Sequence, residues 1–255
     1  MFRQSLIVLV AALSVAVCAG CEPRCDVQHS GSENPGTERG MRERIDRLAS
    51  DIAKADADVV VLQEVDQNTD RSGGVDVAAE LRNALNARME RDYVAHEYFR
   101  VCKLNDGYYG LAVLSRYKID AVETRSLWNG AGTGKRCGGQ VDGEPRGALL
   151  VRTGGFEIVD VHLTSGSDDT SISRRRTQAN RLRDWLGDRE DTVIAGDMNT
   201  RGVSSQLTSD LSYEHVAQNG LDHIFIGTSL VAKRTGTVNS SNSDHNLVWA
   251  HIDNP

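Results

Sequence analysis

The chain has no excess of positive charge. Lysine and arginine number 29 against 36 aspartate and glutamate, which gives a formal net charge of −7 over 255 residues. Such an acidic protein is unsuited to coating nucleic acid non-specifically, because that kind of binding depends on many basic contacts to phosphates. Any polyanion that it handles must therefore meet a local basic patch or a bound cation.

Long hydrophobic runs, repeats and composition breaks are also lacking. The apolar run Leu6 to Val17 covers about twelve residues, fewer than a helix needs to cross a bilayer comfortably. We find no internal repeat and no long apolar hairpin of the kind that inserts into a membrane. The length suits one large domain or two small ones, and the even composition favours one.

The beginning of the chain has the pattern of a targeting segment. Arg3 precedes the apolar run, and Cys18-Ala19-Gly20-Cys21 follows it. This pattern predicts a signal peptide over residues 1–20, with Cys21 as a lipid-bearing N-terminus. Cleavage nearby by an ordinary signal peptidase is the alternative. Either way we expect an exported protein, secreted or lipid-anchored at the bacterial cell surface, with the anchor as its only membrane contact.

After the targeting segment, residues 21–40 are rich in glycine, serine, proline and charge, which predicts a linker. Residues 41–255 then form the predicted domain. Export permits disulfides. With Cys18 removed and Cys21 at the processed end, three cysteines remain, and we predict a bridge between Cys102 and Cys137, although sequence by itself does not establish connectivity.

Helical patterns alternate with short apolar runs along the domain. Apolar spacing predicts helices over Met41–Ala55, Val77–Met89 and Arg174–Leu186, with Arg175 and Arg176 solvated on the last. Helices interleaved with many short strands predict a four-layer α/β/β/α sandwich, in which two mostly antiparallel sheets lie face to face with helices outside. The expected strands are Val59–Leu62, Leu111–Leu114, Ala148–Val151, Phe156–Leu163, Thr192–Ala195, Leu221–Ile226 and Asn246–Ile252.

The segment Thr192–Asn199 is the most informative stretch. Its first three residues are β-branched, as is typical of a short buried strand, and Gly196 permits a turn. Asp197 and Asn199 follow two positions apart, so on extended backbone they point to the same side. A carboxylate beside an amide suits a hydrated hard cation together with a phosphate. An Asx turn that closes the strand is the alternative.

Polar groups end six expected strands in the same way, at places where hydrophobic packing would not require them. Each has an ordinary explanation by itself, as a surface acid, a core histidine or a turn residue. Their repetition at the same kind of position favours one shared site. The residues are Glu64, Tyr109, Asp160 with His162, Asp197 with Asn199, Asp222, and Asp244 with His245.

These residues belong to motifs that follow one another along the chain. They are Gln63-Glu64-Val65, Tyr109-Gly110-Leu111-Ala112-Val113-Leu114-Ser115-Arg116, Asp160-Val161-His162-Leu163, Gly196-Asp197-Met198-Asn199, Leu221-Asp222-His223-Ile224 and Ser243-Asp244-His245. In type and order they resemble the motifs of the endonuclease/exonuclease/phosphatase superfamily, which includes deoxyribonucleases, abasic-site endonucleases, sphingomyelinases and inositol polyphosphate 5-phosphatases. The resemblance runs from about Met41 to the C-terminus and is specific to the superfamily, not to one member.

The resemblance implies a role for each residue. Glu64 is the implied principal Mg²⁺ ligand, with Mn²⁺ as a substitute, and Asp244 is implied to orient His245 and to lie on the metal side. His245 then acts as general base or stabilises the phosphorane, and Asp197 lies near the attacking water. The implied phosphate contacts are Asn199, His162, Tyr109 and, less directly, Arg146, while Asp222 is a structural or metal-side acid.

The sequence departs from the family pattern at its beginning. The family opens with a strand that carries an asparagine, whereas the region around Gln28 is short and polar, without an apolar strand around it. The position after Gly110, often asparagine in relatives, is Leu111. We therefore expect a first strand that is degenerate or lost.

Three functions fit these patterns. The first is an exported, monomeric, Mg²⁺-dependent phosphodiesterase, most simply a nuclease acting on DNA, and Arg174–Arg176 forms either a local basic patch for it or a solvated helix start. The second is a phosphoesterase for phospholipid or inositol phosphate headgroups, to which an acidic, tethered protein is also suited. The third is a catalytically silent binding protein with the same fold, which the weak first strand suggests and the retained acids and histidine oppose.

Overall fold

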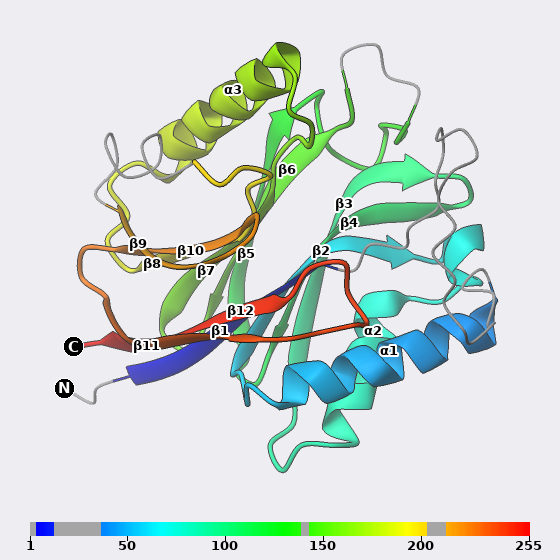
Figure 1. Ribbon diagram of the computed structural model, residues 1–255, viewed down its shortest axis with the longest axis horizontal. Coiled ribbons are helices and arrows are strands. Elements are labelled where there is room, and N and C mark those ends of the chain that lie inside the picture. Colours follow the sequence, from blue (N-terminus) through cyan, green and yellow to red (C-terminus); the bar gives the residue numbers. More distant parts are fainter. Residues whose placement is uncertain (1–3, 13–36, 139–142, 203–212) are drawn as a thin grey trace.

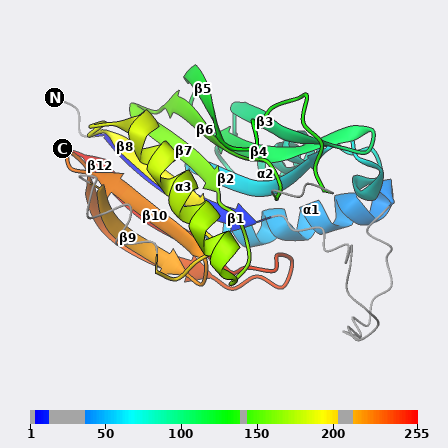
Figure 2. The same ribbon diagram turned by 90° about the horizontal axis from the view of Figure 1, so that it is seen from above.

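Two six-stranded sheets pack face to face, with helices on their outer surfaces (Figure 1). The computed structural model describes residues 4–12, 37–138, 143–202 and 213–255. Helices α1 (Glu38–Ala53) and α2 (Val77–Asn86) cover the first sheet, and α3 (Asp169–Leu186) lies over the second, as the view from above makes plain (Figure 2). The arrangement confirms the predicted four-layer α/β/β/α sandwich.

The first sheet has the strand order β11-β12-β1-β2-β4-β3. All neighbours in it are antiparallel except β1 and β2. Its strands are β1 (Gln4–Ala12), β2 (Val59–Gln67), β3 (Ala95–Leu104), β4 (Gly107–Ser115), β11 (Val231–Val238) and β12 (Leu247–Asn254).

The second sheet has the order β5-β6-β7-β8-β10-β9, and only β7 and β8 run parallel. The sequence patterns predict none of the four strands β3, β5, β9 and β11. Exposed positions interrupt β5, β9 and β11, and most positions of β3 are only partly buried, so the apolar residues of these strands do not form the continuous run that marks a buried strand. The strands of the second sheet are β5 (Ile119–Trp128), β6 (Arg146–Thr153), β7 (Phe156–His162), β8 (Thr192–Asp197), β9 (Tyr213–Asn219) and β10 (Asp222–Gly227).

Strand β1 corrects the expectation of a missing first strand. It lies in the middle of the first sheet, antiparallel to β12 and parallel to β2, and comes from the segment in which the sequence predicted a signal peptide. Its side chains are apolar on both faces, because one face meets the second sheet and the other meets the helices. The folded domain thus includes residues well before the predicted boundary at residue 41. The region around Gln28, with Cys21 and Cys25, lies outside the described residues.

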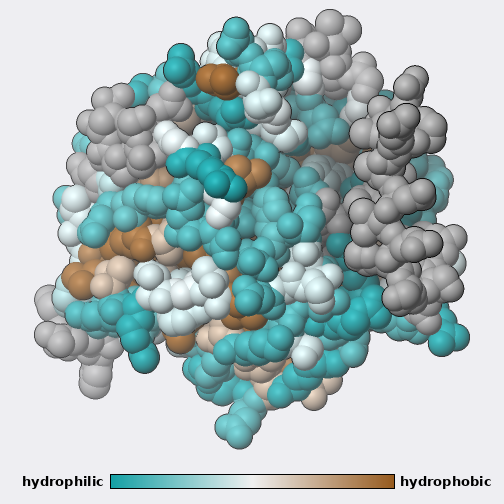
Figure 3. Space-filling view, in the orientation of Figure 1, coloured by the Kyte–Doolittle hydropathy of each residue, from teal (hydrophilic) through white to brown (hydrophobic). Residues whose placement is uncertain are grey.

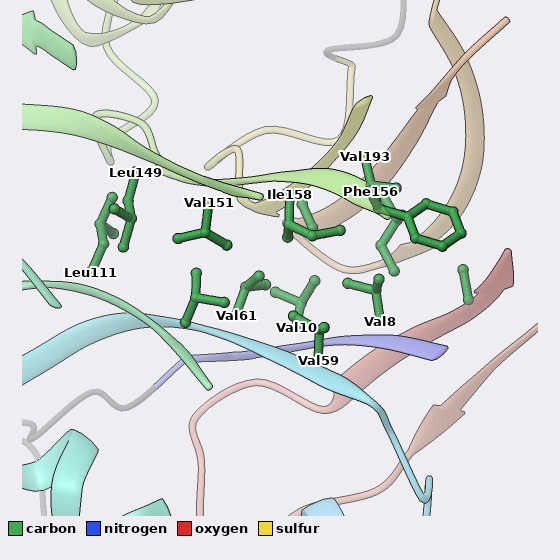
Figure 4. Packing of buried hydrophobic residues seen from close by; sticks show 14 of the residues in the cluster. Val8, Val10, Val59, Val61, Leu111, Leu149, Val151, Phe156, Ile158 and Val193 are labelled. Carbon is green, nitrogen blue, oxygen red and sulfur yellow. The ribbon is translucent and has the colours of Figure 1, made fainter. Parts of the chain in front are cut away.

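The core between the sheets is built from valine, leucine and isoleucine. Val8 and Val10 of β1 and Val59 and Val61 of β2 point toward Ile158 and its neighbours in the second sheet (Figure 4). Alternate positions of the same strands face α1 and α2 in a separate cluster. Because β1 and β2 are buried on both sides, the centre of the first sheet is packed tightly and holds the residues of β2 in fixed positions.

Capping residues in the sequence explain where the helices begin. Thr37 accepts a hydrogen bond from the backbone N–H of Gly40, and Asp76 and Asp168 do the same for α2 and α3. The predicted helices are confirmed, although α3 begins at Asp169 instead of Arg174. No helix in the described part of the chain is long and apolar enough to cross a membrane.

The described part of the chain contains a disulfide bond and, on the face drawn in Figure 3, has a mainly polar surface. Cys102 and Cys137 are bonded, with their Cα atoms 5.3 Å apart, so the predicted bridge is confirmed. Figure 3 shows a mainly hydrophilic face with small hydrophobic patches. Within the described ranges the exposed large hydrophobic residues are Val94, Tyr117, Val122 and Val231.

Candidate active site

The polar strand ends meet at one end of the sandwich. Residue Gln4 pairs with Asn254 where the described chain begins and ends, whereas Ala12 lies opposite Gln63 at the other end of β1. Glu64 and His245 therefore lie at the end remote from the two termini, which share the left side of Figure 1. Distant segments thus converge as the sequence predicted.

Strand pairing brings three of the polar side chains side by side. His162 is the register partner of Asp197 across β7 and β8, and Asp197 is the partner of Asp222 across β8 and β10. Gly196 makes this close packing possible, because a Cβ there would stand 1.9 Å from the carbonyl oxygen of Val161. The glycine of the motif is therefore required for strand contact just before Asp197.

His245 is held by Asp222, not by Asp244. Its Nδ1 lies 3.0 Å from Oδ2 of Asp222, a carboxylate with no exposed surface. This hydrogen bond is the main reason that the pKa of His245 is raised from 6.5 to about 9. The expectation that the adjacent Asp244 orients the imidazole is wrong. Asp244 is exposed, and its charge adds only a minor part to the same rise.

Asp197 is buried beneath this pair. Burial raises its pKa from 3.8 to about 7, with the charge of Asp222 as the next cause. Its Oδ1 accepts a 2.7 Å hydrogen bond from the backbone N–H of Asn199, so the Asx turn considered as an alternative is present. Its Oδ2 faces the Nδ2 of Asn199 at 3.3 Å and the Nε2 of His162 at 3.8 Å. The Asx turn at Asp197 is therefore part of the polar cluster, and the two interpretations of this segment do not exclude each other.

Of the predicted phosphate contacts, Asn199 and His162 lie within 3.8 Å of Asp197, and Arg146 shares a hydrogen-bond acceptor with Asn199. Asn199 donates from Nδ2 to the carbonyl oxygen of Leu163 at 2.9 Å, and Arg146 donates from Nε to the same oxygen at 3.3 Å. His162 is buried, and desolvation together with the charge of Arg146 holds its pKa well below the usual range. A neutral His162 can donate to or accept from a phosphate oxygen without adding charge.

Glu64 lies at a bulge in β2. The register of β2 with β4 shifts between Leu62 and Val65, and Glu64 has a φ of 60°. Its charge helps to raise the pKa of both Asp197 and Tyr109, which places it within electrostatic range of both. Burial is the larger cause for Tyr109. The charge of Glu64 thus acts on residues from two different sheets, and its role as a metal ligand stays a prediction.

A buried pair lies under the bulge. Nε2 of Gln63 donates to Oδ1 of Asp160 at 2.6 Å, joining β2 of the first sheet to β7 of the second. Neither side chain has exposed surface, and burial raises the pKa of Asp160 well above its usual range. This bond links the strand that carries Glu64 to the strand that carries His162. Asp160 was predicted as a site residue, and the structure places it below the site surface.

Three further residues near the site were not singled out from sequence. Arg71 forms a double hydrogen bond with Asp66, at 2.6 and 2.7 Å, and its guanidinium lies 5.5 Å from the ring centre of Tyr109. Arg44 of α1 feels the charges of Asp244, Asp66 and Glu64, although burial lowers its pKa. Arg44 and Arg71 lie on or next to helical segments, so no strand-end pattern points to them.

The acidic groups fit a divalent cation. Asp197, Asp222 and His245 each offer a ligand atom within 4.8 Å of the others. Oδ1 of Asp222 is buried and has no hydrogen-bond partner among the described residues. The charges of Glu64 and Asp222 both raise the pKa of Asp197, so each of these two carboxylates repels Asp197. A hard cation with oxygen ligands would relieve that repulsion.

A search of protein-family models adds the decisive observation. The model described as the endonuclease/exonuclease/phosphatase family matches residues 20–245. The chain belongs to this family. Its members generally hydrolyse phosphate esters, often with a divalent metal, and the motif residues converge here in the way that the family resemblance implied. The match begins after β1 (Gln4–Ala12) and runs through all the motif residues to His245.

Solved structures of family members share the fold. A family protein from Beutenbergia cavernae is 17% identical with a TM-score of 0.67, covering 98% of this chain and 71% of its own. One from Bacteroides thetaiotaomicron is 16% identical with a TM-score of 0.67 and full coverage of both chains. A mannosyl-6-phosphatase from the same species is 17% identical, with a TM-score of 0.60 and coverage of 97% and 99%. No curated protein matches the chain.

Proposed function

We propose that this protein is a metal-dependent phosphodiesterase that hydrolyses nucleic acid, with DNA as its substrate class. The observation that carries the proposal is the cluster of Asp197, Asp222 and His245, in which Nδ1 of His245 lies 3.0 Å from Oδ2 of the buried Asp222, the register partner of Asp197. The cluster occurs in a family whose members act on phosphodiesters such as DNA. Its position at one end of both sheets gives it rigid support.

His245 is the group that stabilises the phosphorane. With a pKa of about 9 the imidazole carries a proton at neutral pH, so it donates to a non-bridging oxygen as negative charge develops there. Asp222 fixes the ring through Nδ1, which leaves the Nε2–H free to point at substrate. Of the two roles that the family resemblance implies for His245, stabilising the phosphorane therefore suits a protonated imidazole better than acting as general base.

Asp197 is then the general base. Its pKa of about 7 allows the carboxylate to accept a proton from water near neutral pH. The backbone N–H of Asn199 holds its Oδ1, which keeps Oδ2 in a fixed position. His162, whose Nε2 lies 3.8 Å from Asp197, and Arg146, whose charge acts on His162, would donate to the phosphate.

Glu64 and Asp244 remain the predicted holders of the cation. Bound there, Mg²⁺ or Mn²⁺ would neutralise charge on the phosphate oxygens and assist the leaving oxygen. The bulge at Glu64 and the exposed position of Asp244 leave both carboxylates accessible to an ion from solvent.

Plasmid cleavage tests the proposal. The purified protein should nick supercoiled DNA with Mg²⁺ and lose this activity on addition of a chelator. His245→Ala and Asp222→Ala should each lower the rate by at least about 100-fold. His96→Ala is the matched control, because His96 lies next to Arg82 outside the site. Chelator-insensitive cleavage, or full activity in His245→Ala, contradicts the proposed chemistry.

A phosphomonoesterase for a sugar or lipid headgroup is the second candidate. It is favoured by the acidic charge of the chain and by the likeness to a structure named as a mannosyl-6-phosphatase. A panel of plasmid DNA, mannose 6-phosphate, phosphatidylinositol phosphates and sphingomyelin separates the candidates by relative kcat/KM. If calorimetry detects neither Mg²⁺ nor Mn²⁺ binding and no substrate turns over, the protein is the catalytically silent relative.

Export to the cell surface also remains a proposal, supported by the apolar run and the cysteine that follows it. Cleavage before Cys21 would remove β1 from between β12 and β2. The mass of the protein purified from its host distinguishes a chain that retains residues 4–12 from a processed one.

A further inference from the structure

A depression of about 500 Å³ adjoins the candidate active site. It lies between the loop after β7, the first turns of α3 and the loop after β8. Leu163 and Asn199 line it, and these are the residues whose hydrogen bond closes the side of the catalytic cluster. The depression and the cluster therefore share a wall.

The lining of the depression is basic. Arg175, Arg176 and Arg201 contribute to it, and no aspartate or glutamate does among the described residues. The whole chain has a net charge of −7, so this pocket is positively charged on a protein that is negative overall. The remaining polar lining consists of neutral groups such as Thr200 and Ser167, which bind an anion without repulsion.

The three arginines have different positions. Arg175 is buried, which corrects the expectation that it is solvated, and its Nη1 donates to the carbonyl oxygens of Thr164 and Gly166 at 2.8 and 2.6 Å. It therefore fixes the loop that forms one wall. Arg176 and Arg201 are exposed at the rim, where their guanidinium groups can reach a ligand.

Asp168 lies beside this pocket and caps α3: its Oδ1 accepts from the backbone N–H of Ser171 and its Oδ2 from the Ser171 hydroxyl, at 3.0 and 2.6 Å. The charges of Asp168 and Asp197 both act on the buried Arg175. The exposed Arg176 and Arg201 therefore carry the positive charge that a ligand from solvent would meet.

We propose that this pocket binds a second phosphate of the substrate, next to the phosphate that is hydrolysed. The inference deepens the proposed function and rests on it. Arginine forks match phosphate oxygens in pairs, and a pocket that shares Asn199 with the catalytic cluster receives the group adjacent to the scissile bond. The substrate class is accordingly a phosphoester with at least two phosphates, as in a polynucleotide strand or a ring with two phosphates.

Matched substrates with one and two phosphates test this assignment. The nucleotide arm compares TpT with pTpT and TpTp, and the sugar arm compares mannose 6-phosphate with mannose 1,6-bisphosphate. In each arm the measured quantity is the ratio of kcat/KM for the two-phosphate substrate to that for the one-phosphate substrate. The arm with the larger ratio identifies the source of the second phosphate.

The variant Arg176→Ala/Arg201→Ala should lower that ratio about tenfold, mainly through KM. The control Arg125→Ala/Arg234→Ala removes the same charge from exposed positions that do not line the pocket. An unchanged ratio in the first variant, an equal fall in the control, or no preference in the wild type overturns the inference.

Binding separates this inference from the proposed function. Fluorescence anisotropy of labelled pTpT and TpT in a chelator needs no turnover. If no substrate is hydrolysed but pTpT binds about tenfold tighter than TpT, and the Arg176/Arg201 variant loses the difference, the phosphodiesterase proposal fails and the pocket stands. Equal binding of the two dinucleotides contradicts the pocket whatever the activity.

Discussion

Replacing Asp222 by asparagine tests the link on which the catalytic assignment of His245 depends. The side chain keeps its shape and can still accept a hydrogen bond, but its charge is lost. In the wild type the His245 pKa is about 9 instead of 6.5, which corresponds to about 3 kcal/mol of preferential proton binding in the folded state. Asp222 is the largest cause of that difference, ahead of Asp197 and Asp244. We therefore expect the pKa in Asp222→Asn to lie nearer 6.5 than 9.

The same shift has a defined sign for stability. A histidine whose folded pKa exceeds its unfolded value stabilises the protein fully below about pH 6.5, and this contribution is lost as the pH rises through about 9. In Asp222→Asn most of the contribution of up to about 3 kcal/mol should be missing already at pH 6.

The assay is an NMR titration of the His245 ring in protein kept free of metal by a chelator. Asp244→Asn is the matched control: it also removes one carboxylate next to His245, yet its pKa should stay close to the wild-type value because Asp244 is a minor cause. A wild-type pKa near 6.5 refutes the reasoning. So does a larger fall in Asp244→Asn than in Asp222→Asn.

Three further predictions concern the acid under the site, the first strand and the disulfide. Asp197→Asn should abolish hydrolysis and yet raise the free energy of unfolding at pH 8 by up to about 4 kcal/mol, because a carboxyl group with a pKa of about 7 is destabilising in its ionised form. In urea titrations this gain should vanish below about pH 4, and a loss of stability at pH 8 would contradict the prediction. Val10→Asp should prevent folding, as judged by circular dichroism, because Val10 has no exposed surface and a buried charge is destabilising. The control Val94→Asp, at a position that is 61% exposed, should fold normally. A folded Val10→Asp variant would show that the domain does not need β1. Serine at both Cys102 and Cys137 should lower the free energy of unfolding by about 3–4 kcal/mol for a separation of 35 residues, an effect that reductant should reproduce in the wild type.

Much of the fold was readable because the buried strands are short, apolar and closed by polar residues. Val59–Leu62 and Thr192–Ala195 are continuous apolar runs, as strands covered on both faces must be. Strands β3 and β5 escaped notice because most positions of β3 are only partly buried, several positions of β5 are exposed, and both have mixed composition. Local pattern therefore identified the centre of each sheet better than its edges.

Strand β1 shows a different limit. An apolar run bounded by a positive residue and by cysteines has the same local composition whether it is a signal peptide or a strand buried on both faces. Only the gap between β12 and β2 assigns Gln4–Ala12 to the sheet, and that gap is a property of the whole fold.

The sequence by itself singled out Asp197, Asp222 and His245, because a polar residue at or just beyond the end of an apolar run is visible in the local pattern. Only the tertiary structure decided how they pair. Asp244 is next to His245 in the chain, but its side chain is exposed and its charge is only a minor cause of the raised His245 pKa. Asp222, 23 positions earlier, lies on another strand whose end faces His245 at 3.0 Å. Contact between strands, rather than distance along the chain, therefore sets the charge of the imidazole.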